Sequence, residues 1–364
     1  MIKKHTLALL LALVPVGVAM AQGRPSAPKV DAATRTEVIG SLAKQLHANY
    51  VFPDVARQAS AELVAKNAKG GYASATDAEA FAEALSKDLR AFGRDGHFRV
   101  GFAPGYHPHP TTLTPEAPSQ ADQEQMRQQV ASAAYGIQRL ERLDGNVGYM
   151  ELRAFGPTDM VSDALSSAMR LLSGTDALIL DLRRNGGGEP GTVAYLMSHF
   201  FAADDKRHLN DIHTRATDRT EQYWTTPVGS HYSKPVYVLT SARTFSGGEE
   251  CAYDFQTQKR GTLVGETTGG GANPGDDFPL SHDFVAFIPT GRAINPITRT
   301  NWEHVGVKPD IATTAADAQN TAYAAILRTL LAAAKDPEHR EGLADTLARV
   351  ENNETEQPNY RPPH

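Results

Sequence analysis

Cysteine is almost absent from this 364-residue chain, in which Cys251 stands alone. A single cysteine excludes an intramolecular disulfide and a zinc site built from several thiolates. We expect Cys251 to be a small buried residue rather than a reactive thiol. After residue 22 the chain also lacks any run that is long and apolar enough to cross a bilayer. The mature chain is therefore expected to have no integral membrane segment.

The chain also lacks an excess of positive charge. It has 36 Lys and Arg against 42 Asp and Glu, a formal net charge of -6, and its basic residues are scattered rather than gathered in a stripe. Nucleic-acid binding proteins usually carry a basic face, so no nucleic-acid partner is expected. Nothing in the composition indicates a metal or an organic cofactor, and nothing indicates an oligomeric state.

The first 21 residues have the features of a signal peptide. Lys3 and Lys4 form a short basic start, residues 7–18 are apolar, and residues 19–21 read Ala-Met-Ala. A small residue at each end of that triplet is typical of a cleavage site, which we place after Ala21. No cysteine follows the site, so a lipid anchor is not expected. The sequence therefore predicts a periplasmic or secreted protein.

The mature chain divides by composition into four parts. Residues 22–102 have apolar residues at helical spacing and predict a small helical domain, with a capping box from Thr76 to Glu79. Residues 103–134 are expected to be a linker, because five prolines are spread over the first 16 or so of these positions. His107 and His109 lie there and are expected to be exposed loop residues rather than metal ligands. Residues 135–340 form the main domain, and 341–364 a polar tail.

Strands and helices alternate in the main domain. Residues 177–182 are a continuous apolar strand, which is typical of a sheet buried on both faces. The alternation predicts an α/β fold with a largely parallel core sheet. The expected strands are 146–152, 177–182, 236–240, 261–265 and 284–288, and the expected helices are 160–172, 192–201, 251–258 and 321–335.

Ser246 lies at a turn between an expected strand, 236–240, and the helix that follows, and two glycines come after it. This arrangement can expose a hydroxyl and direct helix N-terminal amides at one point, as a serine nucleophile and its oxyanion hole require. The same residues admit a structural interpretation. Ser246 and Glu249 spell a capping box, with Gly247 and Gly248 loosening the turn. Both interpretations stay open from this segment alone.

A second glycine-bearing turn, Asn185-Gly186-Gly187-Gly188, follows the strand at 177–182. Ligands in open α/β sheets bind outside the carboxyl ends of strands, where both turns would open. The glycine spacing fits neither a dinucleotide loop nor a P-loop. A plain flexible turn is the structural alternative, but two such turns beside a serine favour an oxyanion hole.

A serine nucleophile needs a base and an acid that orients it. His97, in Asp95-Gly96-His97, is a candidate base at the end of the helical region, and Glu303 is a candidate acid. Each has a structural alternative: a histidine at a helix end is commonly structural, and an isolated glutamate is commonly a surface residue. Spacing alone does not show that the three side chains meet.

Several motifs in order resemble the C-terminal processing peptidases, a serine protease family also called tail-specific or S41 peptidases. The likeness extends over most of the mature chain and is greatest to the branch with the tricorn core and the interphotoreceptor retinoid-binding protein modules. The motifs are Asp95-Gly96-His97, residues 145–149, 181–188, 245–249 and 265–271, and Glu303 with residues 306–310.

The resemblance implies a crotonase-like α/β core and a serine peptidase that cleaves peptides or unfolded proteins. It implies Ser246 as nucleophile, His97 as base and Glu303 as acid. It also implies an oxyanion hole from the backbone amides of Gly247 and Gly188, with Gly187, Gly269 and Gly270 binding substrate.

The chain departs from the family pattern at three points. The processing branch uses a lysine base in the turn after the nucleophile helix, but residues 267–272 contain none, which favours His97. Gly96 stands where tricorn-like proteins have a serine, so a hydroxyl contact to the base is missing. The segment between residues 102 and 145 is too short for a PDZ domain. Two alternatives remain: a non-catalytic carrier of lipophilic, retinoid-like ligands, and an esterase.

Overall fold

The computed structural model describes residues 27–106 and 119–354. The predicted signal peptide, His107, His109 and residues 355–364 of the predicted tail lie outside the described residues. The chain forms two compact units, each assembled from separate segments. The first unit consists of Met1–Glu124, Asn210–Tyr223 and Gly270–Val305, and the second of Gln125–Leu209, Trp224–Gly269 and Gly306–His364.

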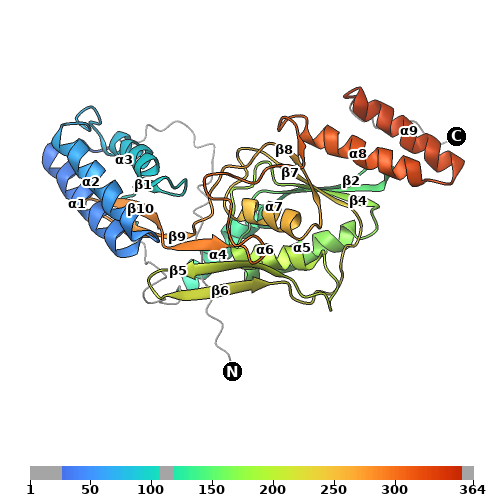
Figure 1. Ribbon diagram of the computed structural model, residues 1–364, viewed down its shortest axis with the longest axis horizontal. Helices are drawn as coiled ribbons and strands as arrows, with labels where there is room; N and C mark the ends of the chain where they lie inside the picture. Colours follow the sequence, from blue (N-terminus) through green and yellow to red (C-terminus); the bar gives the residue numbers. More distant parts are fainter. Residues whose placement is uncertain (1–26, 107–118, 355–364) are drawn as a thin grey trace. The chain divides into compact units, whose positions relative to one another are not determined.

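Three helices and a small antiparallel sheet make up most of the first unit (Figure 1). The sheet has the order β1-β10-β9, and β11 pairs antiparallel with β5 in another sheet, of order β11-β5-β6. The elements of this unit are α1 (Ala32–Asn49), α2 (Pro53–Ala68), α3 (Ala78–Gly93), β1 (Arg99–Phe102), β9 (Gly275–Pro279), β10 (Phe284–Pro289) and β11 (Gly291–Ile294).

Two helices of the first unit, α1 and α3, begin at side-chain caps. Asp31 accepts a hydrogen bond from the amide of Thr34 at 2.8 Å, which satisfies a free amide of α1. At α3 the predicted capping box from Thr76 to Glu79 is wrong by one residue. Asp77 is the cap, and its carboxylate accepts from the amide of Ala80 at 2.9 Å.

The core of the first unit joins its helices to residues far along the sequence. Leu42, Leu85 and Phe81 pack in one buried cluster with Phe284 and Ile288 of β10. The strand expected at 284–288 is present as β10, and it pairs antiparallel with β1 and β9 rather than with strands of the six-stranded sheet. Periodicity shows that a segment is a strand but not with which strand it pairs.

The second unit is built on a six-stranded sheet of order β12-β8-β7-β4-β3-β2. Neighbours from β12 to β3 run parallel, and β2 pairs antiparallel with β3 at one edge. The α/β prediction with a largely parallel core is confirmed. The elements are η1 (Ala134–Gly136), β2 (Ile137–Leu143), η2 (Asp144–Asn146), β3 (Val147–Leu152), α5 (Thr158–Leu172), β4 (Ala177–Asp181), α6 (Pro190–Ser198), β7 (Val236–Thr240), α7 (Gly247–Thr257), β8 (Thr262–Gly265), β12 (Ile311–Ala312), α8 (Ala318–Ala333) and α9 (Pro337–Glu351).

Helices of the second unit cover its sheet. α8 lies against β4, β7 and β8, while α5, α6 and α7 pack on one another and α7 also contacts β7 and β8 (Figure 1). Every residue of β4 is buried, as its continuous apolar sequence predicts. Three further elements cross the boundaries between the units: α4 (Gln120–Ser132), β5 (His208–Thr214) and β6 (Arg219–Trp224).

Two helices lie in segments for which the sequence predicted none. α4 occupies part of the expected linker 103–134, and α9 occupies the beginning of the expected polar tail 341–364. Few residues of either helix are buried. Val130 is the buried residue of α4, and Leu343 and Thr346 are the buried residues of α9. Such sparse apolar residues give a weak helical pattern, so the sequence signal was too small to detect.

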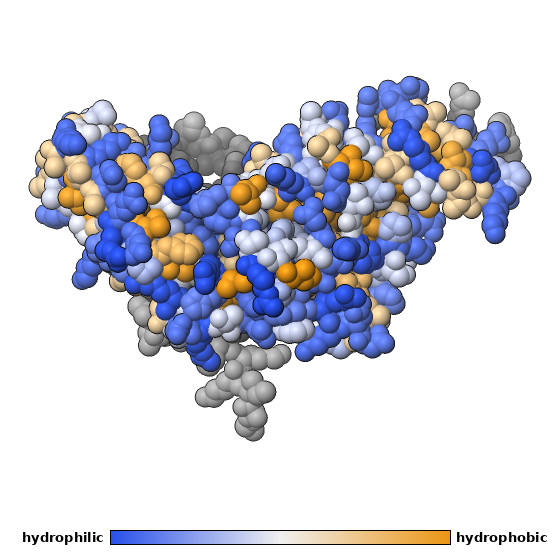
Figure 2. All heavy atoms as spheres, in the orientation of Figure 1, coloured by the Kyte–Doolittle hydropathy of each residue, from blue (hydrophilic) through white to orange (hydrophobic). Residues whose placement is uncertain are grey.

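No helix in residues 27–106 and 119–354 has the length and apolar character needed to cross a bilayer. On the face drawn in Figure 2, apolar side chains are dispersed among hydrophilic ones. The most exposed large apolar residues, Leu171 (75%) and Val305 (62%), belong to separate segments. Isolated apolar residues of this kind are ordinary on a protein surface.

Candidate active site

Ser246 lies at the N-cap of α7, just after β7, in a backbone conformation that non-glycine residues rarely adopt. Its φ is +53° and its ψ is -122°. Holding a serine there costs on the order of 1–3 kcal/mol, and such strain is typically found at functional sites. The residue is half-buried. The predicted turn from strand to helix is thus confirmed, with a strain that the sequence did not reveal.

Glu249 stabilises the strained turn. Its Oε2 accepts a hydrogen bond from the amide of Ser246 at 2.9 Å, which is the Glu249 half of the predicted capping box. Its Oε1 accepts from the hydroxyl of Thr268 at 2.5 Å, and the same hydroxyl accepts from the amide of Val307 at 2.7 Å. Glu249 is fully buried. The turn is therefore tied to the segment that follows β8.

Asn185 connects the second glycine-bearing turn to the Ser246 turn. Its backbone carbonyl accepts from the amide of Phe245 at 3.0 Å, and its Oδ1 accepts from the amide of Gly187 at 2.8 Å. Its Nδ2 donates to the carbonyl of Leu152 at 3.0 Å. The sequence motif contained Asn185, but no pattern assigned it this role. A buried polar side chain that follows a buried strand was the available signal.

The two turns lie in direct contact. A Cβ atom on Gly187 would lie 2.7 Å from the Cβ of Ser246, and one on Gly247 would lie 3.0 Å from the amide nitrogen of Gly188. Gly188 has a φ of +139°, and a Cβ there would overlap the carbonyl oxygen of Phe155. These positions require glycine because a larger residue would push the turns apart.

The amides of Gly188 and Gly247 are both buried, and within the described residues neither donates a hydrogen bond to another protein group. Buried amides without a partner are rare in folded proteins. Gly247 is also the first residue of α7, where the helix leaves its amides unsatisfied. Two such donors beside one serine can stabilise a negatively charged oxygen.

His97 lies in the first unit, in the turn between α3 and β1. Its side chain is 10% exposed, and its ring stacks on Phe287 with centroids 6.1 Å apart. The Nδ1 of His97 is 3.7 Å from Oδ1 of Asp95, which is itself buried. The structure therefore places a carboxylate beside the predicted base, from a residue two positions earlier that the sequence had not assigned to it.

Glu303 lies in the same unit and is also largely buried, with 9% of its side chain exposed. Its Oε2 accepts from the amide of Ala272 at 2.5 Å. Ligand atoms of Asp95, His97 and Glu303 all lie within 4.8 Å of one another. The predicted base and acid are thus close together, and Glu303 is not the surface carboxylate of the structural alternative.

The predicted substrate-binding glycines lie in both units. Gly269, in the second unit, donates its amide to the carbonyl of Thr244 at 3.0 Å, next to the Ser246 turn. Gly270, in the first unit, accepts from the amide of His304 at 2.9 Å. Ser246, Gly247, Gly187 and Gly188 belong to the second unit, and His97 and Glu303 to the first.

The three clustered residues Asp95, His97 and Glu303 also belong to the types that bind Zn²⁺. Donor atoms around one tetrahedral Zn²⁺ are separated by roughly 3.3 Å, given metal–ligand bonds of about 2.0 Å. The ligand atoms of this cluster lie within 4.8 Å of one another, and those of Asp95 and His97 are 3.7 Å apart. An imidazole flanked by carboxylates also suits proton transfer.

Burial perturbs two groups near the Ser246 turn. Desolvation raises the pKa of Glu189, the N-cap of α6 directly after Gly188, to about 7, although the amide of Thr158 donates to its carboxylate. Cys251 is fully buried in α7, and desolvation holds the pKa of its thiol well above the ordinary value. A buried thiol of this kind is not a nucleophile, as expected from the sequence.

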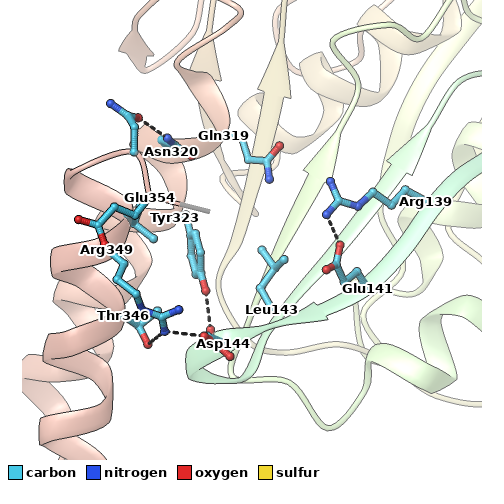
Figure 3. A pocket seen from close by; sticks show the side chains of 12 residues that line it. Arg139, Glu141, Leu143, Asp144, Gln319, Asn320, Tyr323, Thr346, Arg349 and Glu354 are labelled. Atoms are coloured by element: carbon cyan, nitrogen blue, oxygen red, sulfur yellow. Dashed lines mark hydrogen bonds and ion pairs between the residues drawn. The ribbon is translucent and has the colours of Figure 1, made fainter. Parts of the chain in front are cut away.

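A cleft of about 570 Å³ lies elsewhere in the second unit, and none of the predicted site residues lines it (Figure 3). Its charged side chains pair with one another: Arg139 with Glu141, and Arg349 with Asp144 at 2.6 Å. The hydroxyl of Tyr323 donates to the carbonyl of Asp144 at 2.8 Å. The cleft is therefore lined mainly by polar and charged residues.

Two family models match the chain in sequence order. Residues 32–141 match the N-terminal domain of peptidase S41 in eukaryotic IRBP, and residues 146–313 match peptidase family S41. The second match includes Ser246, Gly247, Glu303 and both glycine-bearing turns, and the first includes His97.

Solved structures of other peptidases are similar to this chain. A proposed peptidase from Parabacteroides merdae ATCC 43184 is 17% identical, with a TM-score of 0.52, over 77% of this chain and 90% of that chain. The photosystem II D1 C-terminal processing protease is 16% identical, with a TM-score of 0.47, over 78% and 94% of the two chains. The tricorn protease is 13% identical, with a TM-score of 0.48, over 88% and 37%. The crotonase-like α/β fold with an N-terminal helical domain is confirmed, and the chain belongs to peptidase family S41, a family of serine peptidases.

Proposed function

We propose that the protein is an exported serine endopeptidase whose nucleophile is Ser246. The observation that carries the proposal is a serine held at φ +53° beside two buried glycines, Gly188 and Gly247, whose amides donate to no other group among the described residues. A serine that only caps a helix requires neither a strained backbone nor two amide donors beside it. Ser246 begins α7 and can still present its hydroxyl to a substrate, so the two interpretations of the turn are compatible.

In the proposed reaction His97 removes the proton of the Ser246 hydroxyl as the oxygen attacks a peptide carbonyl. The amides of Gly188 and Gly247 stabilise the negative oxygen of the tetrahedral intermediate. His97 then protonates the leaving amine, and water hydrolyses the acyl-enzyme. Glu303 stabilises the imidazolium. The substrate is a peptide or an unfolded protein, bound along Gly187, Gly269 and Gly270.

The test is the variant Ser246→Ala. We expect peptide hydrolysis to fall by at least 10³-fold, because the nucleophile is lost, with a change in unfolding free energy of about 1 kcal/mol or less. Initial rates on an unfolded protein substrate and the melting temperature are measured together. Ser132→Ala, at an exposed serine of α4, is the control. If Ser246→Ala kept the wild-type rate, Ser246 would be only a helix cap.

The same assay separates the alternatives. Hydrolysis of simple esters but not of peptides would favour an esterase. Saturable binding of a retinoid or fatty acid, without hydrolysis, would favour a carrier. The cleft shown in Figure 3 does not favour a carrier of lipophilic ligands, because the residues that line it are largely polar and charged.

Export is proposed from the sequence of residues 1–21, with cleavage after Ala21. N-terminal sequencing of the protein from periplasmic and culture fractions tests it. A mature chain beginning at Gln22 is expected, whereas a protein that keeps Met1 in the cytoplasm would contradict the proposal.

A further inference from the structure

Two carboxylates, those of Asp95 and Glu303, lie close to the imidazole of His97, and different contacts hold each of them. Asp95 comes from the same turn and places Oδ1 3.7 Å from Nδ1. Glu303 comes from a distant segment, and one of its oxygens accepts the amide of Ala272. Asp95 therefore approaches Nδ1 from within the turn that carries His97.

Asp95 occupies a site built to hold a negative charge. It is 1% exposed, and its Oδ2 accepts from the Nδ2 of Asn273 at 2.9 Å and from the hydroxyl of Tyr50 at 3.3 Å. Its Oδ1 also accepts from the backbone amide of His97 at 3.0 Å. A buried carboxylate with donors on both oxygens keeps its orientation.

The amide contact fixes the position of Oδ1 relative to the histidine. The same oxygen that accepts the backbone amide of His97 lies nearest to its Nδ1, so Asp95 contacts the residue at two points. A carboxylate facing Nδ1 favours the neutral tautomer that carries its proton there. That tautomer leaves the lone pair on Nε2, the nitrogen that acts as base toward a serine in a triad.

We propose that Asp95 is a positioning residue that sets the tautomer and orientation of His97 for proton transfer, with Tyr50 and Asn273 holding it in place. This inference rests on the proposed function of His97. Glu303 then acts on the imidazolium through its charge.

The first test reads the tautomer without measuring activity. The protein is labelled with ¹⁵N-histidine, the His97 signals are assigned with His97→Gln, and long-range ¹⁵N–¹H correlations are recorded at a pH where the imidazole is neutral. We expect the proton on Nδ1. A proton on Nε2 in the wild-type protein would overturn the proposal, whatever the behaviour of any variant.

The second test is kinetic. In Asp95→Asn the amide group of the new side chain can face Nδ1 and select the other tautomer, so we expect kcat to fall by about 10³- to 10⁴-fold with KM nearly unchanged. The matched control is Asp88→Asn, because Asp88 is a largely buried carboxylate of the same unit that accepts from the hydroxyl of Tyr72 at 2.7 Å. The control is expected to keep kcat within about threefold.

The outcomes separate the two proposals. Asp95→Asn with an unchanged tautomer, or with a kcat within tenfold of the wild type, would contradict a positioning role. If this variant does not fold, the wild-type tautomer decides. Full activity of Ser246→Ala would instead overturn the proposed function, and it would leave the tautomer measurement valid.

Discussion

Ser246 shows how one strained residue is held in place by its neighbours. Its positive φ is unfavourable, and the hydrogen bond from its amide to Glu249 offsets part of that cost. Glu249 is in turn fixed by Thr268. The carboxylate that looks like a helix-capping residue in the sequence therefore also keeps the serine in its strained conformation.

Glu189 gives a prediction about pH. Burial raises the pKa of this carboxyl to about 7 in the folded state, from an ordinary value of 4.5. The folded protein thus holds a proton that the unfolded chain releases between these two values, so stability falls as the pH rises from 4.5 to 7. The full loss is on the order of 3 kcal/mol.

The variant Glu189→Gln isolates this contribution. The free energy of unfolding of wild type and variant is measured with urea at pH 4.5, 6 and 8. As the pH increases, the wild type should lose stability relative to the variant. Other titrating groups are common to both proteins and cancel in the difference. A difference that does not change with pH would mean that Glu189 has an ordinary pKa.

At the scale of elements, the two turns that follow β4 and β7 act as one assembly. Parallel strands bring their carboxyl ends to the same edge of a sheet, which explains why segments 60 or so residues apart in the chain meet. Glycine at 187, 188 and 247 lets the turns touch. Asn185 joins the turns, because its carbonyl accepts from the amide of Phe245, and its side chain holds its own turn through Gly187 and Leu152.

The glycine turn offers a matched pair of substitutions. Gly188→Ala should lower kcat/KM by about 10²- to 10³-fold and destabilise the fold, because its Cβ would overlap Phe155 and displace an amide donor. Gly186→Ala, two residues away, has open space around the new Cβ and should keep nearly full activity. Steady-state kinetics and thermal melts of both variants provide the comparison. Equal effects at the two positions would contradict the role given to Gly188.

At the scale of the whole molecule, the two units share one chain that passes between them repeatedly. The buried cluster of the first unit includes Leu42 and Phe81 from the N-terminal helices and Phe284 and Ile288 from β10. The helices of this unit therefore lack a complete core without residues from much later in the sequence.

A fragment spanning residues 27–124 is accordingly expected to be unfolded or to melt without cooperativity. Joining residues 27–106 to residues 270–305 through a short linker should restore a cooperative transition, because β9 and β10 complete the buried cluster. Circular dichroism melts of the two fragments make the comparison. Cooperative melting of the first fragment would show that its helices form a core by themselves.

The sequence alone determined the α/β class, the parallel strands, the strand-to-helix turn at Ser246 and the glycines of the second turn. These features are local, since hydrophobic period and turn residues act within a few positions. The motifs around His97 and Glu303 also indicated these two residues as the candidate base and acid.

Only the tertiary structure decided which distant groups meet. It placed β10 with β1 rather than in the core sheet, brought Asn185 against the Ser246 turn, and set Asp95 beside the imidazole of His97. It also showed the strain at Ser246 and two amides, of Gly188 and Gly247, that have no partner in the part of the chain that the structure describes. Such facts depend on which segments pack together, and the local patterns of a chain do not contain that information.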